Sequence, residues 1–205
     1  MYRVIRLIFL FAFIHFKLNG QIDIRHGGTT TKTLLDTALC SASAFNLEAF
    51  ATNSAAYTYQ WSIPTSANVA LSNATSPIVG ISTTAPLSTI TSVLVTLSAT
   101  PTSGSPVIVQ TITLILFPNL SFVFPANYCS NNPASLLIAT PAGGVFRSGI
   151  QGLVDSTTGT FNPSAGQPTG TFSVTYKLSH TGPSGEVRTC ATTKSTTITS
   201  VPTAT

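Results

Sequence analysis

Apolar and polar residues alternate along much of the chain, which is the pattern of β-strands with one buried side and one exposed side. In residues 57–63 the alternation brings two tyrosines, Trp61 and an isoleucine to one face, and Pro64 ends the run. Further alternating segments are residues 89–99, 107–117 and 171–178. Serine and threonine together exceed a quarter of the chain, and charged residues are only 7% of it. Because threonine, valine, isoleucine and aromatic residues suit half-buried pleated surfaces, we predict an all-β protein.

One stretch of the sequence occurs twice. Residues 97–104 (LSATPTSG) and 178–185 (LSHTGPSG) agree at five positions, and each lies between an alternating strand and a threonine-rich strand. This indicates one closing hairpin used twice, which favours two modules over a single large sandwich. We predict two tandem Ig-like β-sandwich modules, over residues 33–118 and 119–200, with a tail over 201–205. When the alignment of the two copies is extended along the chain, Cys190 corresponds to Val109.

The first twenty residues have the pattern of a signal peptide. Arg3 and Arg6 precede an apolar run over residues 7–16, which is too short to span a bilayer. Cleavage before Gln21 would leave a linker over residues 21–32. We therefore expect secretion, or location at the cell surface or in the periplasm, with no transmembrane segment in the mature protein.

Removal of that segment changes the charge balance. The whole chain has nine basic and five acidic residues, and Arg3, Arg6 and Lys17 are lost with residues 1–20. The mature chain is nearly neutral, and its remaining basic residues are scattered singly. Nucleic-acid binding needs clustered lysine and arginine, so we expect no nucleic-acid partner.

Three cysteines leave one unpaired in any intramolecular scheme. Cys129 and Cys190 bracket the second predicted module, so we assign the disulfide to Cys129 and Cys190 and leave Cys40 as the free thiol. Cys40 is then either a small buried apolar residue or the donor of an intermolecular disulfide.

Trp61 is the single tryptophan, and its place on an alternating strand predicts the core anchor of the first module. A row of aromatic residues could instead form a platform on which sugars stack. Exposure of Tyr57, Tyr59, Tyr128 or Tyr176 side by side on one flat face would favour that alternative.

We identify no catalytic, cofactor-binding or metal-binding residues and expect no enzyme. The acids Glu48, Asp155 and Glu186 are isolated, whereas acid–base catalysis usually needs two titrating groups in opposed environments. Calcium sites need several carboxylates, and zinc sites need paired cysteine or histidine spacing. The sequence has neither arrangement.

The second module resembles a known family through several motifs in order. They are Cys129, the segments 141–146 (PAGGVF), 161–166 (FNPSAG) and 172–176 (FSVTY), and the late Cys190. These resemble the Ig-like repeats of large surface proteins in Bacteroidetes, except that Cys190 follows Glu-Val-Arg-Thr and not glycine. Residues 59–64 (YQWSIP) resemble the PKD-like domains of the same kinds of protein. Thr37 and Ser156 lie in short motifs similar to the O-glycosylation motif of these bacteria.

The resemblance implies a non-enzymatic exported surface module that acts as a spacer or adhesion domain, without a cofactor. The chain could be one piece of a larger tandem-repeat protein, and its partners would be a surface glycan or a protein. Two alternatives are a carbohydrate-binding module and a self-assembling fibre subunit, in which long threonine-rich edge strands such as residues 107–117 pair between chains. A further alternative is an accessory module of a secreted hydrolase.

Overall fold

A computed structural model describes residues 22–27, 36–40, 44–52, 56–65, 68–103, 106–165 and 169–201. Within these residues the protein is all-β, as predicted, with sixteen strands and no helix. No described helix is therefore long and apolar enough to cross a membrane. The predicted signal peptide over residues 1–20 lies outside the described residues, as does most of the predicted tail.

The first eight strands, which we call the first module, form two four-stranded sheets. One sheet has the order β1-β3-β6-β5, with β1 over Ile22–His26, β3 over Ala44–Ala51, β6 over Ile78–Thr83 and β5 over Val69–Ser72. The other has the order β2-β8-β7-β4, with β2 over Asp36–Leu39, β8 over Ile108–Leu116, β7 over Thr91–Pro101 and β4 over Tyr57–Ser62. β2 runs parallel to β8, and the other pairs are antiparallel.

The inward side chains of these two sheets form one hydrophobic core cluster. Trp61 is 1% exposed at its centre, and its indole Nε1 donates a hydrogen bond to the carbonyl of Ser76 at 3.0 Å. Because the bond satisfies the one polar group of the indole, the whole ring can be buried at the position expected for a core anchor.

The remaining strands, which we call the second module, repeat this arrangement with shorter pieces. The larger sheet has the order β10-β16-β15-β13, with β10 over Asn127–Cys129, β16 over Val187–Thr199, β15 over Gly170–Thr181 and β13 over Val145–Ser148. The facing layer consists of the pairs β9–β12 and β11–β14, with β9 over Ser121–Phe122, β12 over Ala139–Thr140, β11 over Ser135–Leu136 and β14 over Thr160–Phe161. A second core cluster, rich in aromatic rings, lies between these layers.

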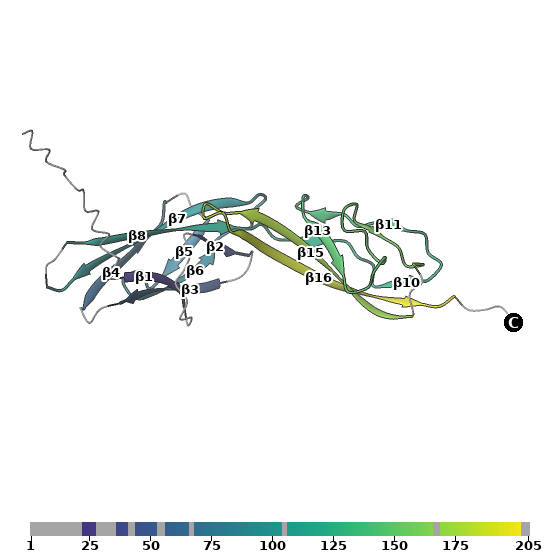
Figure 1. Cartoon of the computed structure of the whole chain (residues 1–205), viewed down its shortest axis with the longest axis horizontal. Helices are drawn as coiled ribbons and strands as arrows, with labels where there is room; N and C mark the ends of the chain where they lie inside the picture. The colour runs from purple at the N-terminus through teal and green to yellow at the C-terminus, as the bar shows by residue number, and fades with distance from the viewer. Residues whose placement is uncertain are drawn as a thin grey trace, which may run out of the picture.

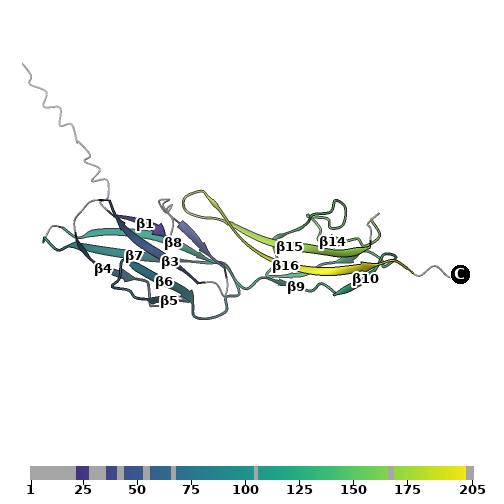
Figure 2. The ribbon, with the colours of Figure 1, turned by 90° about the horizontal axis from the view of Figure 1, so that it is seen from below.

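Both modules have the strand order of Ig-like sandwiches. In each, a first strand pairs antiparallel in one layer, and the next strand crosses to pair parallel with the last strand of the other layer. The last strand, β8 or β16, lies inside that layer, between the strand that has crossed and the strand that precedes it in the chain. The two modules lie end to end in both views, and the β15–β16 hairpin extends from the second towards the first (Figures 1 and 2).

The structure corrects two predictions about the first module. Residues 21–32 are not simply a linker, because β1 lies within them and buries Ile22 and Ile24 in the first core cluster. Residues 107–117 are not a free edge, because β8 lies between β7 and β2. The side chain of Gln110 also donates a hydrogen bond to the carbonyl of Ile22, which ties β8 to β1.

The PAGGVF segment forms a crossing between the two layers of the second module. It joins β12, which pairs with β9, to β13, which pairs with β15. Gly143 has a positive φ of 97°, and the Thr140–Pro141 peptide bond is cis. The hydroxyl of Tyr176 donates to the carbonyl of Pro141 at 2.6 Å and accepts from the amide of Gly144 at 2.8 Å, which holds the crossing against β15.

Candidate functional site: the joint between the two modules

Long-range polar and covalent contacts come together where the β15–β16 hairpin reaches the first module. We call this region the joint. From the first module it contains Asp36, Ala38, Cys40 and Ile115, and from the second module Gly182, Ser184, Arg188 and Cys190.

A buried ion pair forms the polar part of the joint. The side chain of Asp36 at the start of β2 is fully buried, and its Oδ1 lies 2.7 Å from Nε of Arg188 in β16. Nη2 of Arg188 donates to the carbonyl of Asp36 at 2.9 Å, and the amide of Ser184 donates to Oδ2 of Asp36 at 2.8 Å. Arginine, carboxylate and backbone therefore satisfy one another in a single relative orientation of the modules.

The protonation of Asp36 follows from these contacts. Burial of the carboxyl group acts to raise its pKa, but the hydrogen bonds from Ser184 and Arg188 and the charge of Arg188 outweigh burial. The net effect lowers the pKa of Asp36 below its ordinary value of 3.8, so that Asp36 is ionised at neutral pH.

A glycine lets the hairpin turn come this close. A side-chain carbon on Gly182 would collide with the carboxylate of Asp36 and would lie 2.9 Å from Cδ1 of Ile115. The turn itself is closed by a hydrogen bond from the amide of Gly182 to the carbonyl of Glu186 at 2.9 Å. The backbone therefore packs directly on the buried carboxylate of Asp36.

The disulfide of the chain crosses the joint and corrects the predicted pairing. Cys40, immediately after β2, is bonded to Cys190 in β16, with a Cα–Cα distance of 5.7 Å and a sequence separation of 150. Cys129 is the free, exposed cysteine, so the predicted Cys129–Cys190 bond and the free thiol at Cys40 are both wrong. The physical reason is the direction of the hairpin, which carries Cys190 out of its own sandwich and onto the neighbouring module.

Apolar packing makes the two modules continuous at the same place. Ile115, on the outer face of β8, is fully buried in the second core cluster together with Phe117. Ala38, Cys40 and Ile90 of the first module pack against that cluster. The boundary predicted at residue 118 therefore lies beyond residues that already belong to the second core.

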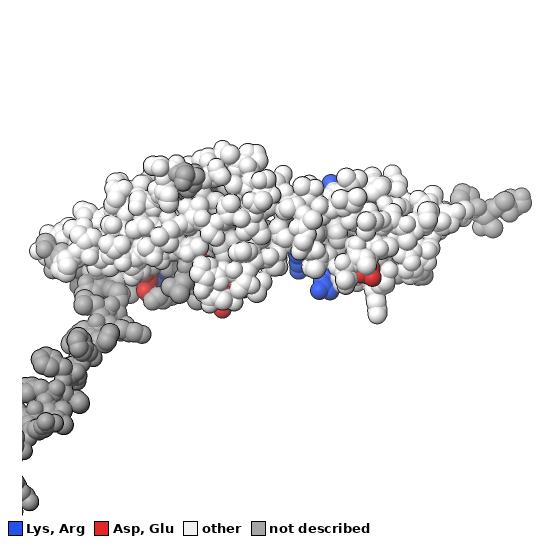
Figure 3. Space-filling model, turned by 90° about the horizontal axis from the view of Figure 1, so that it is seen from above, with Lys and Arg blue, Asp and Glu red and all other residues white. Residues whose placement is uncertain are grey.

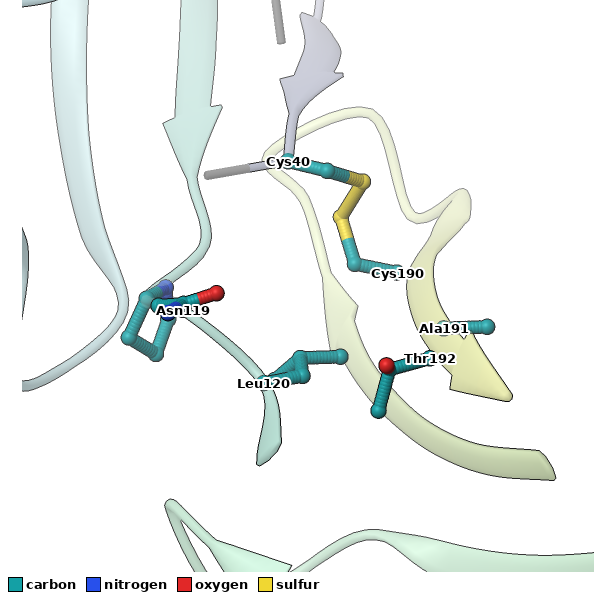
Figure 4. Close-up of a pocket in the computed structure, with 7 residues that line it drawn as sticks. Cys40, Asn119, Leu120, Cys190, Ala191 and Thr192 are labelled. Atoms are coloured by element: carbon teal, nitrogen blue, oxygen red, sulfur yellow. A yellow bond between two sulfur atoms is a disulfide. The ribbon is translucent and has the colours of Figure 1, made fainter. Parts of the chain in front are cut away.

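A small pocket beside the disulfide completes the joint. Its lining residues are Cys40, Pro118, Asn119, Leu120, Cys190, Ala191 and Thr192. The linker residues Asn119 and Leu120 lie across from the bond between Cys40 and Cys190 (Figure 4). No described group of three or more histidine, cysteine, aspartate or glutamate residues could hold a metal ion here or elsewhere in the described chain.

The aromatic residues proposed as a sugar platform do not share an exposed face. Tyr128 and Tyr176 are buried in the second core cluster. Tyr57 and Tyr59 are half-buried against the first, with ring centroids 6.3 Å apart. The side chains that the alternative requires on one flat surface are thus divided between two cores.

The two candidate O-glycosylation residues lie in different surroundings. Thr37 lies inside β2, half-buried, where it pairs with Leu114 of β8. Ser156 is half-buried in a turn next to Asp155, whose carboxylate accepts hydrogen bonds from the amides of Thr157 and Thr158 at 2.8 and 2.9 Å. These bonds lower the pKa of Asp155, which therefore has a structural role as the cap of the turn.

Charged groups are sparse on the surface as well as in the sequence. In the view of Figure 3 most of the described surface is uncharged, and the few charged residues that are visible lie at separate places. His26 stacks on Phe45 at a centroid distance of 4.9 Å, and His180 pairs with Arg188 across the hairpin.

Sequence reasoning missed the residues that form the joint. In the sequence, Asp36 is marked only by the glycosylation motif that includes Thr37, and Gly182 only by the repeat. One signal was present, because the charged segment before Cys190 departs from the glycine of the family pattern. That departure contains Arg188, the partner of Asp36.

Comparisons with known proteins give weak likenesses. No protein-family model matches the sequence, and no curated protein does. Among similar solved structures are a nucleoside hydrolase-related hypothetical protein from Saccharophagus degradans (13% identity, TM-score 0.35) and Drosophila OTK extracellular domains 3–5 (13% identity, TM-score 0.40). Human protocadherin-24 EC1-2 is another (12% identity, TM-score 0.35).

The matched shares of these proteins differ. The match with the hydrolase-related protein covers 47% of this chain and 25% of that structure. The match with OTK covers 82% of this chain and 59% of that structure, and the match with protocadherin-24 covers 89% and 100%. The chain thus spans less than two thirds of the first two, and likenesses of this strength assign neither a family nor an activity. The Ig-like description given above depends on the strand order alone.

Proposed function

We propose that this chain is a non-enzymatic, exported surface module that acts as a stiff spacer, of the kind found in the tandem-repeat surface proteins of Bacteroidetes that it resembles. It would hold a surface glycan-binding or protein-binding partner at a fixed distance and angle from its anchor. The single observation that carries this proposal is the joint, which connects the two modules by a disulfide, a buried ion pair and a shared apolar core.

Stiffness follows from the way these contacts act together. Two domains joined only by a linker are expected to move relative to each other unless their interface is large and apolar. Here Asp36 is satisfied by Ser184 and Arg188 in one orientation, and Cys40–Cys190 prevents separation. Bending the joint would leave a buried carboxylate without partners, which is strongly unfavourable.

Export is supported by the same bond. Disulfides persist in oxidising compartments and are rare in the reducing cytosol. A structural disulfide between Cys40 and Cys190 therefore favours a secreted, surface or periplasmic location, in agreement with the signal-peptide pattern of residues 1–20.

The non-enzymatic part of the proposal is supported by the distribution of reactive groups. Asp36 and Asp155 are engaged structurally, and no described group of three or more histidine, cysteine, aspartate or glutamate residues could hold a metal ion. The carbohydrate-binding alternative loses its aromatic platform, because Tyr128 and Tyr176 are core residues.

Small-angle X-ray scattering of the mature chain tests the spacer role. The oxidised protein should scatter as one elongated rigid body, and Cys40→Ser combined with Asp36→Ala should give a broader distribution of shapes with a smaller average length. Cys129→Ser is the matched control, because it removes a thiol outside the joint and should leave the scattering unchanged. An oxidised chain as variable in shape as the double variant would refute the proposal.

A further inference from the structure

Strand register places Cys129 and Cys40 at the same position of their respective modules. β4 and β13 are equivalent strands of the two modules, and each carries a large aromatic residue of the core. Trp61 of β4 pairs with Leu97 of β7, and Phe146 of β13 pairs with Tyr176 of β15. These two pairs fix the alignment of the modules. Leu97 in the first module therefore corresponds to Tyr176 in the second.

The alignment extends across the sheet without a gap. Six residues before Leu97, Thr91 pairs with Leu116, and six residues before Tyr176, Gly170 pairs with Ile198. On the parallel strand beyond, Leu116 pairs with Leu39 and Ile198 pairs with Tyr128. The residues that follow Leu39 and Tyr128 are Cys40 and Cys129.

The two equivalent cysteines differ in their bonding state. In the first module Cys40 is bonded to the hairpin of the next module, whereas Cys129 is exposed and free, with the Thr199 hydroxyl 3.9 Å from its sulfur. The first module thus shows what a cysteine at this position binds. We propose that Cys129 is the attachment point for a cysteine on the β-hairpin of a further Ig-like module, placed end to end with the second module as the second is with the first.

The same register describes the partner. Leu178 pairs with Cys190 in the second module, and the equivalent residue Ala99 pairs with Ile108 in the first. Ile108 therefore has the position of Cys190 in the first module. The sequence repeat gave Val109 for this position, which is wrong by one residue. A second copy of this chain would therefore present an isoleucine and not a thiol. The partner is a module with a cysteine in the last strand of its closing hairpin.

The polar part of the joint is absent at this second position. Asp36 lies three residues before Leu39, and the residue three before Tyr128 is Pro125. Since no carboxylate is present at that position, the partner hairpin needs no counterpart of Arg188.

Bond formation requires an oxidant. The thiols of Cys129 and of the partner lose two protons and two electrons as their sulfurs join, and a disulfide-bonded thiol oxidoreductase of the export compartment is reduced to its dithiol form. The inference rests on the proposed function, because it extends the same spacer by one more fixed joint.

The test uses protein from the cells that make it, with free thiols alkylated before lysis and peptides then mapped by mass without reduction. We expect Cys129 to be protected from alkylation as fully as Cys40, and linked to a cysteine peptide from outside residues 22–201. Linkage to the same polypeptide would identify a following module, and linkage to another polypeptide would identify a separate subunit.

Other outcomes overturn the inference and separate it from the proposed function. Alkylated Cys129, or Cys129 capped only by a small thiol, with Cys40–Cys190 intact would refute the attachment site and leave the spacer standing. Alkylation of Cys40 and Cys190 as well would contradict both. In a matched pair of strains, Cys129→Ser should remove the linked species while the Cys40–Cys190 bond remains, which excludes loss through misfolding.

Discussion

Stretching the chain by its two ends should release little of its length while the Cys40–Cys190 disulfide is intact. Force applied before Ile22 and after Val201 passes along the chain to Cys40, through the sulfur bridge to Cys190, and on to the end. The chain between the two cysteines carries no tension in this geometry, even after its strands separate.

The structure fixes the expected lengths. The sequence separation of the two cysteines is 150, which corresponds to roughly 500 Å of fully extended chain. The described residues outside the bridge, 22–40 and 190–201, can contribute only about 100 Å. Reduction should therefore raise the maximum extended length of the described chain about sixfold, from about 100 Å to about 600 Å.

Single-molecule force spectroscopy with handles at the two ends measures this difference directly. The oxidised chain should show short extensions only, and addition of a phosphine reductant should add the long one. Cys129→Ser should behave as the wild type in both conditions, whereas Cys40→Ser should show the long extension without reductant. A long extension in the oxidised wild type, or none after reduction, would refute the assigned bridge and with it the protection of the modules from tension.

Three further predictions concern single side chains. Asp36→Asn should destabilise the protein by about 3 kcal/mol at pH 7 in urea unfolding, because it leaves Arg188 without its charge partner. Since the folded pKa of Asp36 lies below its ordinary 3.8, its contribution is complete above about pH 5 and is lost as the pH falls, so the wild type should lose more stability than Asp36→Asn between pH 5 and pH 2. Gly182→Ala should lower the free energy of unfolding by about 2 kcal/mol, because the added methyl group collides with its neighbours at the joint. Gly185→Ala is the control for backbone strain in the turn, because Gly185 has a positive φ but open space around it. Tyr176→Phe should lower stability by about 2 kcal/mol, because the Pro141 carbonyl and the Gly144 amide lose their shared partner, and Tyr59→Phe, which leaves that turn intact, should cost less.

Local periodicity was sufficient to predict several of the longer strands. The run at residues 57–63 becomes β4 with Trp61 in the core, and residues 89–99 become most of β7. These features depend on contacts within one strand pair or one sandwich. Alternation of side chains records such contacts directly, because each inward residue must be apolar.

The joint could not be predicted in the same way. Asp36 and Arg188 are 152 residues apart, and each looks like an isolated surface charge in the sequence. The cysteines were misassigned because Cys129 and Cys190 bracket one module, and proximity in sequence was taken as proximity in space. What decides the pairing is the length of β15 and β16, whose twelve and thirteen residues carry the hairpin beyond its own sandwich.

The three components of the joint have different physical consequences, and their magnitudes show which does what. The disulfide closes a loop of 150 residues and on the chain-entropy model stabilises the folded state by about 5 kcal/mol, mainly by restricting the unfolded chain. Burial of Ile115 adds about 2 kcal/mol of apolar stabilisation, but apolar contacts tolerate sliding.

A buried ion pair often contributes little net stability, because desolvation offsets the attraction. The bonds of Asp36 to Ser184 and Arg188 are directional, however, so the pair selects one angle between the modules from those that the disulfide and the apolar contact would allow. A spacer needs a defined angle as much as it needs cohesion, and the directional bonds of this pair, whatever its net contribution to stability, determine the direction in which the next module points.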